Sequence, residues 1–156
     1  MDDSKRLQVI EAHARRFRAA IESCEPKQLP ITLRDFPKGS CGDASLLLAE
    51  YLKSKGIGPL TYVCGQIVTD HQRGDIQTHA WLEMDDIIID ITPDQFDGVT
   101  QQIMVTKDHS WHEQFEITRR EGADLNRWIG PAIGPLRRML GNRDDRARCH
   151  CSQTPH

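Results

Sequence analysis

The sequence has no long run of apolar residues and few aromatic ones. No stretch approaches the roughly 18 consecutive apolar residues of a membrane span, and Phe, Trp and Tyr make up only 6% of the 156 residues. With 11 Gly and 8 Pro, collagen-like, low-complexity and wholly disordered chains are excluded. The charged first residues contain no apolar stretch of the secretory kind. We therefore expect a cytoplasmic globular protein without a membrane partner.

The sequence also lacks the excess of basic residues that nucleic-acid binding requires. Its formal net charge is −3, whereas binding to phosphates needs a basic surface. We expect no nucleic-acid partner. Residues 119–148 are the exception, with eight arginines against four acidic residues. We interpret them as a solvated helix face and chain end, and contact with an acidic partner is the alternative.

Cysteines are few and odd in number, which argues against a disulfide framework in a chain without a secretory signal. The five are Cys24, Cys41, Cys64, Cys149 and Cys151. Cys149 and Cys151 flank a histidine, but no second ligand pair has matching spacing. We therefore predict no metal and no cofactor. The predicted organisation is one domain over residues 1–141 and a disordered tail over residues 142–156.

The hydrophobic pattern predicts helices followed by strands. Apolar residues at helical spacing indicate an amphipathic helix from Ser4 to about Ser23, and an extended connection then leads to Gly39. Ser40 and Asp43 fit a capping box that opens a second, buried helix, which Gly56 ends. Further patterns predict strands over 60–68, 78–84 and 87–91, a short strand over 103–105, and interrupted helix over 123–140.

Cys41 is the cysteine whose position suggests chemistry. It lies in the first turn of the second predicted helix, where unpaired backbone N–H groups and the helix dipole favour a thiolate. Those N–H groups are also suited to binding an oxyanion. Gly42 beside it permits close approach of a substrate backbone. A thiol nucleophile also needs a base and a group that orients the base.

The hairpin around Asp85 and Asp86 provides both groups. A two-residue turn there pairs Met84 with Ile87 and places the side chains of His79 and Asp90 on one face of the sheet. Asp90 lies among isoleucines, where an ionised carboxylate is costly without a partner. We expect His79 to be that partner.

These residues resemble a known family. The segments GSCGDASLLLAEYL and THAWLEMDDIIIDITPDQF are similar to the core of the transglutaminase-like branch of the papain-like cysteine enzymes, over residues 36–97. The resemblance implies an α+β fold with a nucleophile-bearing helix packed on an antiparallel sheet, flanked by N- and C-terminal helices. It also implies Cys41 as nucleophile, His79 as general base and acid, and Asp90 as the orienting carboxylate.

The chain departs from the family pattern in two respects. A papain-type enzyme has a glutamine a few residues before its nucleophile, whereas Asp35 occupies that neighbourhood here. The chain is also much shorter than animal transglutaminases and has no obvious calcium-binding loop. The side-chain oxyanion donor and the substrate therefore stay open. Gly42, Trp81 and Gln95 are the candidate substrate-binding residues, and His112 is left without a role.

The expected function is a cysteine hydrolase or acyltransferase that acts on an amide bond of a peptide or a glutamine side chain through a thioester. Proteolysis, deamidation and transamidation share this machinery, and we lean towards hydrolysis because water is always available. One alternative is an inactive domain kept as a binding module. Another is a metal site that uses Cys41, His79 and Asp90, all of which are competent zinc ligands. The oligomeric state is left open.

Overall fold

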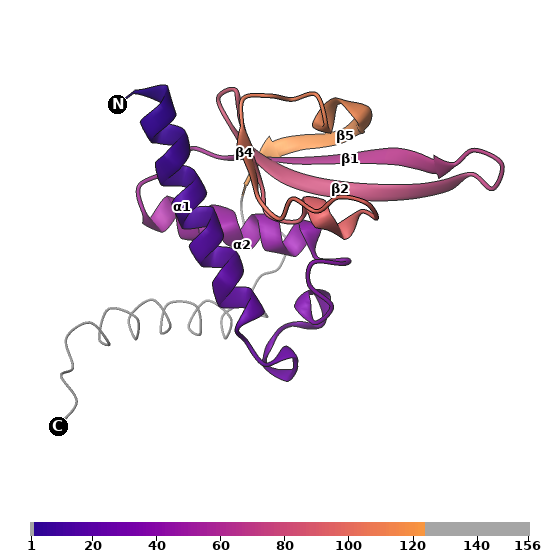
Figure 1. Cartoon of the computed structure of the whole chain (residues 1–156), viewed down its shortest axis with the longest axis horizontal. Helices are drawn as coiled ribbons and strands as arrows, with labels where there is room; N and C mark the ends of the chain where they lie inside the picture. Colours follow the sequence, from indigo (N-terminus) through magenta and orange to yellow (C-terminus); the bar gives the residue numbers. More distant parts are fainter. Residues whose placement is uncertain (1, 124–156) are drawn as a thin grey trace.

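Two helices lie against one antiparallel sheet in the computed structural model, which describes residues 2–123 (Figure 1). In that part of the chain the sheet has five strands in the order β4-β3-β2-β1-β5. The strands are β1 (Thr61–Asp70), β2 (Asp75–Met84), β3 (Ile87–Asp90), β4 (Met104–Thr106) and β5 (Glu116–Gly122). The predicted α+β class is confirmed. The helix predicted over 123–140 and the tail predicted over 142–156 lie outside the described residues, apart from Ala123.

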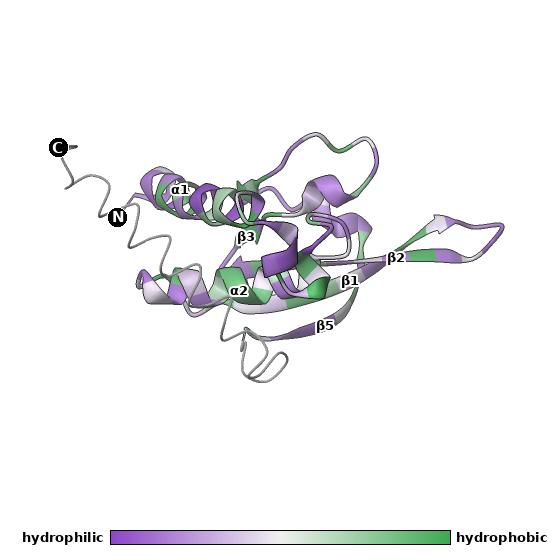
Figure 2. Ribbon diagram, turned by 90° about the horizontal axis from the view of Figure 1, so that it is seen from below, coloured by the Kyte–Doolittle hydropathy of each residue, from purple (hydrophilic) through white to green (hydrophobic). Residues whose placement is uncertain are grey.

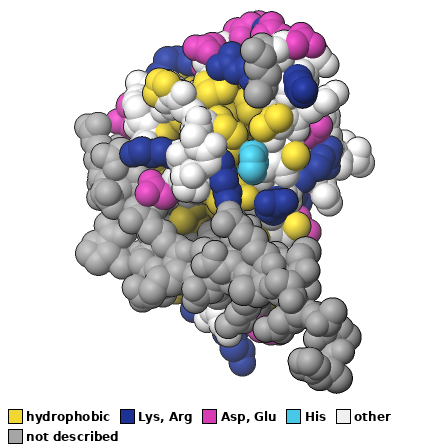
Figure 3. Space-filling model, turned by 90° about the vertical axis from the view of Figure 1, so that its left-hand side faces the viewer, with side chains coloured by type: hydrophobic (Ala, Val, Ile, Leu, Met, Phe, Trp, Pro, Cys, Tyr) yellow, Lys and Arg dark blue, Asp and Glu magenta, His cyan; other side chains and the backbone are white. Residues whose placement is uncertain are grey.

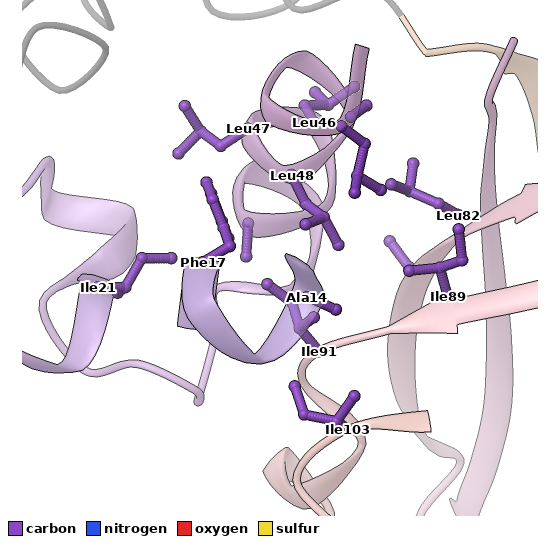
Figure 4. Close-up of a cluster of buried hydrophobic side chains, with 14 of the residues drawn as sticks. Ala14, Phe17, Ile21, Leu46, Leu47, Leu48, Leu82, Ile89, Ile91 and Ile103 are labelled. Atoms are coloured by element: carbon purple, nitrogen blue, oxygen red, sulfur yellow. The ribbon is translucent and has the colours of Figure 1, made fainter. Parts of the chain in front are cut away.

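The two predicted helices form close to their predicted bounds. They are α1 (Asp3–Glu22) and α2 (Cys41–Ser54). Phe17 of α1 and Leu48 of α2 are buried in the main core together with Ile89 of β3. Figure 4 shows these side chains filling the space between the helices and the sheet. Helix α1 therefore packs against β3 and β4, and α2 packs mainly against β2, on one face of the sheet.

The connection between the helices differs from the predicted extended chain. It contains two short 3₁₀ turns, η1 (Pro26–Gln28) and η2 (Ile31–Leu33). The predicted capping box is also wrong, because the Ser40 side chain makes no cap hydrogen bond. Ser40 has an α-region backbone (ψ −5°), and its hydroxyl donates instead to the carbonyl of Thr32 at 2.8 Å. Asp43 accepts a hydrogen bond from the Thr32 hydroxyl. Both residues thus tie the connection to the start of α2.

The predicted turn between β2 and β3 is confirmed, with Met84 paired to Ile87 across Asp85 and Asp86. Strand β2 begins at Asp75, earlier than predicted, because it pairs with β1 from Asp75 to Glu83. The β1–β2 hairpin consequently extends well beyond the two helices (Figures 1 and 2).

Strand β5 was not predicted. Its residues are almost all exposed and do not alternate between apolar and polar, since among residues 2–123 it is an edge strand whose one partner is β1. The pairing is irregular between Cys64 and Gly65. A Cβ atom at Gly65 would lie 2.9 Å from Cβ of Phe115, so glycine permits the close approach of the chain that leads into β5.

The side of the molecule opposite the hairpin tip has a mixed surface. Figure 3 shows hydrophobic side chains there between lysines and arginines, with acidic side chains gathered at one edge. Among residues 2–123, no helix combines the length and the apolar character needed to cross a bilayer.

Candidate functional site

The sheet face that turns away from α2 carries a small aromatic cluster. Buried Val63, Trp81, Ile88 and Phe115 form its centre, with Phe96 and Trp111 packed around them. The His79 ring lies within this cluster, with its centroid 5.2 Å from that of Phe96 and 5.7 Å from that of Trp111. The residue is completely buried. Rings on several sides therefore fix the orientation of the imidazole.

Asp90 is the hydrogen-bond partner of the His79 imidazole. Nε2 of His79 lies 2.6 Å from Oδ2 of Asp90, and the carboxylate is 1% exposed. The other carboxylate oxygen accepts the backbone N–H of Thr92 at 3.0 Å. Side chains two residues apart on a strand share a face, so the confirmed hairpin register is what brings the two residues together.

A second histidine completes this network. His112, at the start of the short turn η4 (His112–Gln114), places its Nε2 2.8 Å from the same Oδ2 of Asp90 and is 3% exposed. The sequence gives His112 no role, because it lies 22 positions after Asp90 and beyond β4, in a segment that no strand register places. Its only sequence signal is its position between Trp111 and Phe115, both of which belong to the aromatic cluster.

The electrostatics of the pair favour a charged histidine and a charged carboxylate. Burial alone lowers the pKa of His79, but the charge of Asp90, its hydrogen bond and the neighbouring Cys41 thiol together raise that pKa to about 9. Burial alone raises the pKa of Asp90, but the charge of His79 and hydrogen bonds from His112 and His79 hold it well below its usual range. The Asp90 carboxylate is therefore ionised, so both imidazole Nε2 atoms act as donors to it.

Cys41 is the first residue of α2, is half-buried and interacts with the His79 side chain. The Cys41 thiol is among the causes of the raised pKa of His79, through a hydrogen bond and through charge. Because Nε2 of His79 is engaged with Asp90, Nδ1 is the nitrogen available to the sulfur. That Nδ1 has no other hydrogen-bond partner in the described part of the chain. The structure thus brings together Cys41, His79 and Asp90, the three residues singled out in the sequence.

A groove of about 450 Å³ opens beside Cys41. It is lined by Lys38, Gly39, Cys41, Ile76, Gln77, Thr78, Gln95 and Asp97. A larger hollow of about 620 Å³ lies at the far end of α2, beside Lys53 and Leu60, away from the His79 network. The groove at Cys41 is therefore the space in which a substrate would meet the thiol.

The three candidate substrate-binding residues occupy different positions. Gln95 lines the groove, and its Nε2 donates to the carbonyl of Thr78 at 3.2 Å. Gly42 lies beneath Tyr62, whose hydroxyl would be 3.2 Å from a Cβ atom placed there. Trp81 does not reach the groove: it is 1% exposed, and its Nε1 donates to Glu83 at 3.2 Å. Its ring supports His79 from the aromatic cluster, at a centroid distance of 5.6 Å.

Within residues 2–123, the group of side chains best placed to hold a metal differs from the one weighed from the sequence. It consists of His79, Asp90 and His112, whose ligand atoms all lie within 4.8 Å of one another, and it does not include Cys41. The two Nε2 atoms already lie 2.6 and 2.8 Å from Oδ2. An ion would have to enter between atoms that are hydrogen-bonded to each other. The geometry therefore favours a hydrogen-bonded network.

A scan against protein-family models finds no match for this chain, and searches of curated proteins and of solved structures find none. The resemblance to the transglutaminase-like enzymes therefore stays an expectation.

Proposed function

We propose that the protein is a cysteine-dependent hydrolase or acyltransferase with a transglutaminase-like core, acting on an amide bond of a peptide or protein. The observation that carries the proposal is the buried His79–Asp90 pair, which lies next to a half-buried cysteine at the start of a helix. A thiol, an imidazole and an orienting carboxylate are the parts that nucleophilic acyl transfer requires. The groove beside Cys41 gives the substrate access to the thiol.

In the proposed reaction His79 already carries the Cys41 proton on Nδ1 as an imidazolium, and the sulfur attacks the amide carbonyl carbon as the thiolate. The oxyanion that forms is stabilised by backbone N–H groups in the first turn of α2, whose first intrahelical bond is the one from Ala44 to Ser40. His79 then donates its proton to the leaving amine as the C–N bond breaks, which leaves a thioester. Water, deprotonated by His79, attacks the thioester, and the C–S bond breaks to release the acid and to restore the Cys41 thiolate beside the His79 imidazolium.

Asp90 and His112 are positioning residues in this scheme. Asp90 holds Nε2–H of His79, so that Nδ1 faces the sulfur, and its charge stabilises the imidazolium. His112 donates to the same oxygen and helps to keep the carboxylate ionised. The Cys41 nucleophile and the His79 acid–base are the catalytic residues.

The test is covalent labelling with a benzyloxycarbonyl-capped diazo-oxo-norleucine probe, which mimics a glutamine side chain, followed by mapping of the modified residue. We expect modification at Cys41 and its loss in Cys41→Ser, whose folding circular dichroism would verify. Cys24 and Cys64 serve as internal thiol controls. Labelling spread evenly over the cysteines would contradict the proposal.

A metal centre is the second candidate, because two imidazoles and one carboxylate converge within 4.8 Å. Metal analysis of the purified full chain distinguishes a metal centre from a thiol enzyme. About one equivalent of zinc, lost in both His112→Gln and Asp90→Asn, would favour the metal centre. Zinc far below one equivalent would favour thiol chemistry.

A further inference from the structure

Strand β2 has an open edge beside the groove. Its partner on that side, β3, pairs with it only at Leu82, Glu83 and Met84. The residues from Asp75 to Thr78 pair with β1 on the other side and are all exposed. Ile76, Gln77 and Thr78 also line the groove that contains Cys41. An unpaired strand edge therefore runs into the space in front of the thiol.

The register determines which main-chain groups face that edge. In an antiparallel sheet, successive residues direct their N–H and C=O groups to opposite sides. Met84 and Ile87 flank the two-residue turn, so Met84 and every second residue before it face the β3 side. Two contacts agree with this parity: the carbonyl of Ala80 accepts the Ser45 hydroxyl at 3.3 Å, and that of Thr78 accepts Gln95.

Within the exposed stretch from Asp75 to Thr78, three main-chain groups then remain available on the open edge. They are the N–H and C=O of Ile76 and the N–H of Thr78, since the Thr78 carbonyl is engaged by Gln95. Groups of this kind, spaced two residues apart, match the main chain of an extended peptide. The Ile76 side chain is 54% exposed and offers an apolar contact beside them.

We propose that the open edge of β2 binds the substrate as an added strand, so that the substrate is an extended segment of polypeptide and not a free amino acid or small amide. This inference rests on the proposed function, because the strand edge would serve to place a main-chain carbonyl of the substrate next to Cys41. A peptide residue opposite Ile76 exchanges two hydrogen bonds with it, and a neighbouring carbonyl two residues away accepts the Thr78 N–H. Recognition through the main chain tolerates many sequences, with a preference for an apolar side chain beside Ile76.

A second copy of the chain is the other molecule that could pair with this edge. Charged residues near the hairpin tip disfavour that pairing. Asp70 and Asp75 face each other there, and Arg73 extends from the turn between them. Charged side chains at the end of an open edge disfavour strand pairing between copies.

The experiment compares two reagents on the full-length protein. One is the chloromethyl ketone of benzyloxycarbonyl-Ala-Ala-Ala, which carries a peptide main chain; the other is iodoacetamide, which does not. Ile76→Pro removes the N–H that faces the open edge and keeps the β1 ladder, because proline is tolerated at such edge positions. Ile76→Ala is the matched control, since it trims the side chain and keeps the N–H.

We expect Ile76→Pro to slow labelling of Cys41 by the peptide reagent at least tenfold and to leave the iodoacetamide rate within twofold of wild type. Ile76→Ala should stay within threefold for both reagents. N-methylation of the reagent, one amide at a time, should slow labelling of the wild-type protein at alternate positions only. The N-methylated reagents also test the inference if Ile76→Pro does not fold.

Two results would overturn the inference: equal peptide labelling of the wild type and Ile76→Pro, or no effect of N-methylation at any position. A wild-type dimer in light scattering that Ile76→Pro dissociates would assign the edge to self-association and also overturn it. Failure of both reagents to select Cys41 over the other thiols would count against the proposed function itself.

Discussion

At the scale of single residues, the central feature is the crowded carboxylate of Asp90. Three N–H donors converge on it, from His79, His112 and the backbone of Thr92. A buried carboxylate is costly unless such donors and an opposite charge compensate for lost hydration. Asp90 therefore depends on both histidines, and the histidines depend on it.

We predict that Asp90→Asn lowers the pKa of His79 from about 9 towards its ordinary value near 6.5, because the attraction of the carboxylate is removed while the burial that opposes protonation remains. The measurement is a titration of the His79 ring signals by NMR, with assignment through His79→Gln. Glu83→Gln, which removes a carboxylate that contacts Trp81, is the control. An unchanged His79 titration in Asp90→Asn would contradict this electrostatic explanation.

We predict that His112 variants separate the hydrogen bond from packing. His112→Phe removes the donor and keeps a ring, and should reduce the rate of Cys41 alkylation at pH 6 by at least fivefold, whereas His112→Gln keeps an N–H donor and should stay within about twofold. His109→Gln, in the same loop, is the control, since the only hydrogen bond described for the His109 side chain is with the Asp86 carbonyl. Equal rates in all three variants would show that His112 serves packing alone.

How far the site could be predicted differs from residue to residue. The parity of the hairpin placed His79 and Asp90 on one face, because a short turn and strand alternation determine which side chains share a face. The role of His112 could not be predicted in this way. It reaches Asp90 through an irregular loop, whose path depends on packing of Trp111 and Phe115 against the sheet.

At the scale of the elements, the start of α2 determines where Cys41 lies. Buried Ser40 tethers it to the preceding connection through Thr32, in place of the predicted capping box. The pattern of a serine followed by an acid three residues later was present, but tertiary hydrogen bonds to the connection replaced the local ones. Strand β5 escaped prediction for a related reason, since an exposed edge strand needs no apolar alternation.

We predict that Ser40→Ala destabilises the protein by about 1–3 kcal/mol, because it leaves the Thr32 carbonyl without its buried donor. Ser54→Ala, at the exposed end of α2, should cost less than about 0.5 kcal/mol. The free energies of unfolding in urea provide the comparison. Equal losses in the two variants would mean that the tether contributes nothing beyond a surface hydrogen bond.

At the scale of the whole molecule, the buried pair makes stability depend on pH. The pKa of His79 is raised on folding, so its contribution is complete below about 6.5 and is lost as the pH rises towards 9. The pKa of Asp90 is lowered on folding, so its contribution is present above about 4 and is lost as the pH falls below that value. Stability should therefore be greatest between about pH 4 and 6.5.

We predict that the free energy of unfolding decreases between pH 6.5 and 9 and that His79→Gln reduces this slope. Urea unfolding at a series of pH values measures it, and His109→Gln is again the control. A wild-type profile that is flat over this range would show that the folded protein does not hold the His79 proton more strongly than the unfolded chain.

The central claim is that Cys41 and His79 form an activated pair, and the most direct measurement is the rate of iodoacetamide alkylation of each cysteine at pH 6, resolved by mass spectrometry. We predict that Cys41 reacts at least tenfold faster than Cys149 and Cys151, because the neighbouring imidazolium and the helix start favour its thiolate. In His79→Gln this advantage should disappear while Cys149 and Cys151 react as before. Faster alkylation of Cys149 or Cys151 than of Cys41 in the wild type would contradict the account.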